Sequence, residues 1–133
     1  MTEKNKNILA WVLRLVAAII MLQTLWFKFT GAEESVYIFS TLGLEPWGRL
    51  GTGVMELIAS IVILIPKTTA LGALLAIGIM GGAILSHILF LGISVQGDNG
   101  QLFVYALLVF LSALALLYMY RQDIPIWNRL SRA

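Results

Sequence analysis

The sequence predicts an all-α membrane protein, a single domain of residues 1–133. Four transmembrane helices are expected to run up, down, up and down as a bundle, with a short interfacial helix between the first two. Three observations predict this fold. Of the 133 residues, 59% are hydrophobic and only 12% are charged, roughly half the charged share of a soluble domain. The mean hydropathy of +0.90 implies more apolar surface than a soluble chain of this size can bury. The apolar residues also form continuous stretches of about 20 residues, the length that a helix needs to cross a bilayer.

The four apolar stretches are residues 8–29, 47–65, 69–91 and 102–120. None alternates between apolar and polar residues as a barrel strand does. A backbone inside lipid must make its hydrogen bonds within its own segment, so each stretch is predicted to be a helix. Two lysines precede the first stretch as in a signal peptide, but the stretch is too long for one and no cleavage motif follows. It is therefore expected to remain as a span.

The connections between the stretches predict the topology. Residues 28–46 form the long one, and the amphipathic run 36–42 within it suits a short interfacial helix. Residues 66–68 and 96–100 are turn clusters, so successive helices should be antiparallel neighbours. Small residues four apart in the third stretch predict close packing between helices of the same chain. They are Gly72, Ala76, Gly78, Gly82 and Ser86.

The distribution of positive charge predicts the orientation. If both termini are cytoplasmic, seven of the nine Lys and Arg residues lie on that side, and only Lys28 and Arg49 lie on the other. The even number of spans and the positive-inside rule agree with this arrangement. We expect a multi-pass protein of the bacterial inner (plasma) membrane with both termini in the cytoplasm. The seven residues are Lys4, Lys6, Arg14, Lys67, Arg121, Arg129 and Arg132.

The composition excludes several kinds of chemistry. There is no cysteine and one histidine, so the chain cannot build a disulfide, a Cys-ligated metal or cluster, or a multi-His metal site by itself. A net charge of +2 is too small to indicate nucleic-acid binding. No phosphate loop, Ser/His/Asp set or catalytic carboxylate pair is found. No catalytic residue, metal site or intrinsic cofactor is predicted, which favours a protein without catalysis of its own.

Each predicted helix carries a polar stripe, which indicates a polar interior. Glu56 lies near the middle of the second stretch, where an unpaired carboxylate would take up a proton rather than stay charged. Either Arg14 pairs with Glu56, or Glu56 is protonated. Arg14 could instead extend to the cytoplasmic surface. Glu56 is then either structural or involved in binding a ligand or a proton.

Lys28, Arg49 and His87 are expected near the outer interface, at about the depth of Tyr105. Cations beside aromatic rings could bind an anionic headgroup or an aromatic ligand, or they could belong to the ordinary interfacial belt. A lone histidine at this depth is more typical of a hydrogen-bonded residue than of a metal ligand. The candidate ligand-binding residues are Lys28, Glu56, His87, Arg14, Tyr105 and Arg49.

Short motifs follow one another in a recognisable order. They are FKF at 27–29, LGLEPW at 42–47, GTGVMEL at 51–57 and AIGIMGGA at 76–83, closed by His87. Their order and spacing resemble those of the DoxX-like family of small four-helix integral membrane proteins.

The resemblance singles out Lys28, Glu56 and His87 as the family's characteristic polar positions. One departure is the absence of glycine at 23–25, where the family usually has one before the lysine. The family's founding members are linked to an archaeal terminal quinol oxidase and a thiosulfate:quinone oxidoreductase. Other relatives belong to membrane oxidoreductase complexes, and an animal branch resembles receptor-assembly chaperones.

Three hypotheses follow. In the first, the protein is an accessory subunit of a membrane redox complex or binds a quinone- or lipid-like molecule, which would be its only cofactor, with electrons supplied by a partner. In the second, it is a non-enzymatic assembly factor for another membrane protein. In the third, it is a small proton-coupled carrier that uses Glu56. The partners considered are the lipid bilayer, oxidoreductase subunits or another membrane protein, and a second copy of the chain, but no nucleic acid.

Overall fold

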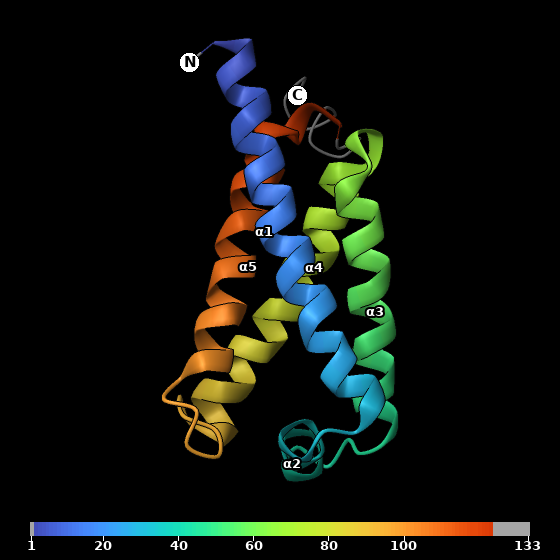
Figure 1. Ribbon diagram of the computed structural model, residues 1–133, viewed down its shortest axis with the longest axis vertical. Coiled ribbons are helices and arrows are strands. Elements are labelled where there is room, and N and C mark those ends of the chain that lie inside the picture. Colours follow the sequence, from blue (N-terminus) through green and yellow to red (C-terminus); the bar gives the residue numbers. More distant parts are fainter. Residues whose placement is uncertain (1, 124–133) are drawn as a thin grey trace, which may run out of the picture.

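The computed structural model describes residues 2–123, which form helices and turns without β-strands (Figure 1). Four segments are long and apolar enough to cross a membrane, and a short helix separates the first two. The predicted all-α architecture is therefore confirmed. The helices are α1 (Glu3–Thr30), α2 (Glu33–Thr41), α3 (Trp47–Leu64), η1 (Pro66–Thr68), α4 (Thr69–Ser86), the π-helical turn η2 (His87–Leu91), α5 (Gln101–Met119) and η3 (Arg121–Asp123).

The first helix begins earlier than its apolar stretch predicts, at Glu3. Thr2 caps it, because its side-chain oxygen accepts a hydrogen bond from the Asn5 backbone N–H at 3.1 Å, which satisfies a donor that the helix leaves free. The acidic side chain of Glu3 in the first turn also matches the positive end of the helix dipole. A polar cap thus extends the helix beyond the apolar residues.

The four spans form a ring in which α1 contacts α3, α3 contacts α4, α4 contacts α5, and α5 returns to α1. Neighbours run in opposite directions, as predicted. One end of the bundle contains the start of α1 and the end of α5, and we call it the terminal end. The opposite end, where α2 lies, is called the α2 end. Towards the α2 end, α1 runs close to α3 and α4 runs close to α5 (Figure 1). The bundle therefore divides there into two helix pairs.

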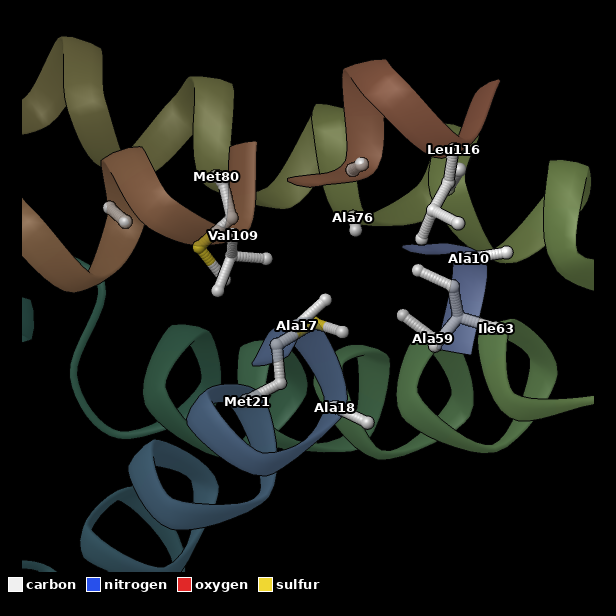
Figure 2. Packing of buried hydrophobic residues seen from close by; sticks show 13 residues of the cluster. Ala10, Ala17, Ala18, Met21, Ala59, Ile63, Ala76, Met80, Val109 and Leu116 are labelled. Atoms are coloured by element: carbon white, nitrogen blue, oxygen red, sulfur yellow. The ribbon is translucent and has the colours of Figure 1, made fainter. Parts of the chain in front are cut away.

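An alanine-rich cluster fills the interior nearer the terminal end. Figure 2 shows side chains from all four spans pointing towards one another, including Ala17 and Met21 of α1 and Val109 of α5. Ala17, Ala59 and Met21 are fully buried. Because most of these side chains are small, the helices approach closely and leave little space between them.

The closest approach of α3 and α4 is at Gly72. A Cβ atom placed there would lie 2.4 Å from the backbone nitrogen of Ile63. The predicted close packing is thus found at Gly72 and at the fully buried Ala76. It is not found at Gly78 and Gly82, where an added Cβ would meet no atom within 4 Å. The physical reason is that α4 leaves α3 for α5 beyond the crossing.

The short helix α2 lies across the α2 end of the bundle (Figure 1). Gly31 ends α1 with a left-handed φ of 69°, and Gly43 follows α2 with a φ of 74°, conformations that glycine adopts without strain. These two turns direct the chain out of α1 and back into α3. Ser35 and Phe39 are the buried residues of α2, so this side of the helix packs against the bundle. The sequence predicts a short helix in this connection, and α2 is found there.

Candidate functional site

A pocket of about 960 Å³ occupies the half of the bundle nearer α2. It is lined by the α2-end halves of all four spans and by α2 itself, and most of its lining residues are apolar or glycine. Met80 and Ala106 belong both to the pocket lining and to the alanine-rich cluster. The cluster therefore closes the pocket on the side of the terminal end. The volume is within the usual range for ligand pockets. Its polar lining residues are Gln23, Thr24, Lys28, Glu34, Ser35, Thr52, Glu56, Ser86, His87, Gln101 and Tyr105.

The pocket also reaches the lipid-facing surface. Phe27 of α1 and Val54 and Met55 of α3 line it, yet these residues are 46%, 47% and 41% exposed. In a membrane-spanning helix, an exposed apolar side chain faces lipid. The pocket is therefore open towards the hydrocarbon.

An ion pair forms the wall made by α1 and α3. The Lys28 Nζ atom lies 2.6 Å from Glu56 Oε1, and the Thr24 hydroxyl donates to Glu56 Oε2 at 2.6 Å. The Glu56 side chain is 1% exposed and that of Lys28 17%. Helical side chains lean towards the N-terminus of their helix, and this direction carries the lysine ammonium back by one turn to the level of Thr24. Both carboxylate oxygens are thus satisfied within the wall.

Of the alternatives for Arg14, the pairing with Glu56 is not the one found. Arg14 donates from Nε to the Thr69 hydroxyl at 3.0 Å and from Nη2 to the Tyr120 hydroxyl at 2.5 Å. The guanidinium also stacks near the rings of Trp11 and Tyr120, at 4.7 and 5.0 Å from their centroids. The lean towards the N-terminus carries this side chain towards the terminal end, away from Glu56. Lys28 supplies the counter-charge to Glu56 that Arg14 does not.

The facing wall, from α4 and α5, carries further polar groups. His87, 5% exposed, opens the π-helical turn, and its Nδ1 lies 3.0 Å from the Gly92 carbonyl oxygen. Its ring meets that of Phe103 edge to face, with centroids 5.6 Å apart. The Tyr105 hydroxyl accepts a hydrogen bond from Gln101 Nε2 at 2.8 Å. Four of the six candidate residues, Lys28, Glu56, His87 and Tyr105, thus line one pocket.

Arg49, the remaining candidate, acts elsewhere in the structure. Its Nε donates to both carboxylate oxygens of Glu45, at 2.8 and 3.0 Å, and its Nη1 donates to the Lys28 carbonyl oxygen. That carbonyl is in the last turn of α1, which leaves such groups without helical partners. Arg49 therefore joins the end of α1 to the start of α3.

Glu34 and Asp98 are a pair that the sequence does not predict. The Asp98 carboxylate accepts backbone N–H groups from Val95 and Gly100 at 2.9 and 2.8 Å and from Leu102 at 3.2 Å. Burial alone would raise the pKa of Asp98, but these donors and the hydrogen bond to Glu34 hold it below its usual value. Burial and the nearby Asp98 charge raise the pKa of Glu34. The two residues are far apart in the sequence, and no spacing in it indicates their contact.

The Glu34→Gln variant should change how stability depends on pH. The folded state binds the Glu34 proton more tightly than the unfolded state, because the pKa rises from 4.5 on folding. This contribution is fully present below pH 4.5 and is lost as the pH rises through the folded-state pKa. The melting temperature of the wild type, measured in detergent, should therefore fall more steeply above this pH than that of the Gln variant. Glu33→Gln, at an exposed neighbour on α2, is the control, and identical profiles for wild type and Glu34→Gln would contradict the assignment.

The four apolar spans, the helix across one end and the pocket between the spans define a multi-pass membrane protein of the four-helix-bundle class. The family model described as DoxX matches residues 9–89 of the chain. This match covers more than half of the sequence, and the chain belongs to the DoxX family, as its motifs predict. The match includes Lys28, Glu56 and His87 and ends before α5. No curated protein and no solved structure matches the chain.

Proposed function

We propose that this protein binds a quinone- or lipid-like molecule in the pocket and serves as an accessory subunit of a membrane redox complex. The observation that carries the proposal is the apolar pocket with polar groups on facing walls. A lipophilic ring or chain would contact the apolar lining, while its oxygen atoms would meet a few fixed polar groups, as in most small-molecule sites.

The polar groups suit the oxygen atoms of such a ligand. A quinone carbonyl only accepts hydrogen bonds, and the pocket offers donors from both walls. The Lys28 ammonium has three N–H groups, of which the contact with Glu56 uses one. The Tyr105 hydroxyl accepts from Gln101, which leaves its own hydrogen free to donate. A bound ring would therefore be held between the two helix pairs.

A redox role also requires a partner. The chain has no cysteine and one histidine, so it lacks the ligands for an iron–sulfur cluster of its own. Electrons would pass between the bound molecule and another subunit of the complex. In the orientation that the positive charges favour, a bacterial inner-membrane protein with both termini in the cytoplasm, the α2 end and the pocket face the outer side.

Filling the pocket should weaken binding. Ala83 lines it, whereas Leu85 on the same helix is 57% exposed and faces lipid. Ala83→Trp should weaken the binding of short-chain ubiquinone and menaquinone analogues by roughly tenfold or more, because the indole takes up volume that the ligand needs. Leu85→Trp should bind as the wild type does. Equilibrium titration in nanodiscs measures both.

No saturable binding of either analogue to the wild type would contradict the proposal. Equal binding by both Trp variants would place the binding site outside the pocket. The partner is tested by gentle extraction from native membranes, which should recover an oxidoreductase subunit in stoichiometric amount.

A further inference from the structure

One buried acceptor in the pocket lacks a hydrogen-bond partner. Glu34 Oε1 is the buried side-chain atom without a partner among residues 2–123, and Glu34 lines the pocket. A carboxyl oxygen of this kind accepts hydrogen bonds. The neighbouring Asp98 carboxylate already takes the three nearby backbone N–H groups of Val95, Gly100 and Leu102. A donor on a bound ligand would therefore give Oε1 the partner that it lacks.

His87 supplies a second acceptor. The Gly92 carbonyl oxygen bonded to Nδ1 can only accept, so Nδ1 carries the hydrogen. In the neutral ring, Nε2 then has a lone pair and no hydrogen. No hydrogen bond to Nε2 occurs within the described part of the chain, although the residue is 5% exposed and lines the pocket. A donor on a bound ligand could pair with this nitrogen.

The described residues that line the pocket include one lysine or arginine, Lys28. Its ammonium is already paired with Glu56 at 2.6 Å. The carboxylate of Asp98, next to Glu34, adds negative charge beside the pocket. An anionic group entering the pocket would therefore find no free cation, and burying it without a counter-charge is strongly unfavourable. A neutral polar group carries no such penalty.

We propose that the pocket selects neutral amphiphiles whose polar end is a hydroxyl group, and that it rejects amphiphiles ending in a carboxylate or a phosphate. A hydroxyl donates one hydrogen bond and accepts others. It can donate to Glu34 Oε1 or His87 Nε2 while it accepts from the Tyr105 hydroxyl. A carbonyl or an ether can only accept, so it leaves both acceptors unpaired. This inference rests on the proposed function, because it concerns the same pocket. A quinone carbonyl can accept from Lys28 or Tyr105 there, and a ligand that also carries a hydroxyl should bind more tightly because it pairs an acceptor as well.

The preference is measured with three probes of equal chain length. Hexadecan-1-ol, hexadecyl methyl ether and palmitate are titrated into the protein in nanodiscs at neutral pH, and the quinone analogues are titrated in parallel. The alcohol should bind roughly tenfold or more tightly than the ether, the effect of one lost hydrogen bond at a buried acceptor, and palmitate should bind most weakly. Palmitate or the ether binding as tightly as the alcohol would overturn the inference. The proposed function would still stand if the quinone analogues bind.

Variants connect the preference to the two acceptors. Glu34→Ala and His87→Phe should each lower the affinity for the alcohol towards that for the ether and leave the ether affinity unchanged. Glu34→Gln keeps a carbonyl oxygen at this position and should retain the preference, as should the control Glu33→Ala at an exposed site. Unchanged selectivity in both Glu34→Ala and His87→Phe would overturn the inference. Because selectivity is a ratio measured within each variant, a modest loss of stability does not affect it.

Discussion

Lys28→Met is expected to lower the free energy of unfolding by about 3–5 kcal/mol, the usual result of leaving one member of a buried ion pair without its partner. Glu56 is 1% exposed and lies 2.6 Å from the lysine ammonium. After the substitution, its carboxylate keeps only the hydroxyl of Thr24. The double variant Lys28→Met/Glu56→Gln should recover most of the loss, because the amide is neutral and its oxygen still accepts from Thr24. Equilibrium unfolding in detergent, followed by tryptophan fluorescence, measures these changes.

Lys67→Met is the matched control. Lys67 lies in η1, where it is exposed, and its substitution should leave the stability nearly unchanged. If Lys28→Met is as stable as the wild type, the pair of Lys28 and Glu56 contributes nothing to the free energy of unfolding. If Lys28→Met/Glu56→Gln is as unstable as Lys28→Met, the lysine acts through some group other than Glu56.

The second large effect is expected at the crossing of α3 and α4. Gly72→Ala would place a methyl carbon 2.4 Å from the Ile63 backbone nitrogen and 2.6 Å from its Cα. Neither atom can move without its helix, so the two helices must separate. We expect a loss of about 1–3 kcal/mol or more, the range for overpacking a dense interior, measured by the same unfolding experiment.

Gly82→Ala is the control with the opposite sign. An added Cβ there meets no atom within 4 Å, and alanine favours a helix over glycine by about 1 kcal/mol. This variant should therefore be slightly more stable than the wild type. Equal effects at the two glycines would mean that α3 and α4 do not cross closely at Gly72.

The spans and the polar faces could be predicted from the sequence because they depend on local properties. Hydropathy and helical periodicity locate the spans and place Thr24 and Lys28 on the face that includes Arg14. Periodicity does not decide which cation on this face pairs with Glu56, and the sequence leaves the pairing with Arg14 as one of several alternatives. Side chains on α1 lean towards its N-terminus, which brings Lys28 closer to Glu56 and takes Arg14 away from it.

The pocket and the contact between Glu34 and Asp98 could not be predicted in this way. Both depend on how the helix pairs separate beyond Gly72 and on how two connections meet at the α2 end. The sequence shows an acidic residue in one connection and a turn in the other, but no periodicity joins them. The left-handed turns at Gly31 and Gly43 place α2, and only the folded chain shows that α2 closes one end of the pocket.

The location of the opening determines which concentration governs binding. The pocket meets the hydrocarbon at Phe27, Val54 and Met55, and the alanine-rich cluster closes it towards the terminal end. A lipophilic molecule would therefore arrive sideways from the leaflet around the α2 end and leave by the same route. Occupancy would follow the mole fraction of the ligand in that leaflet rather than its concentration in water. A molecule confined to the opposite leaflet would have to change sides before this protein could bind it.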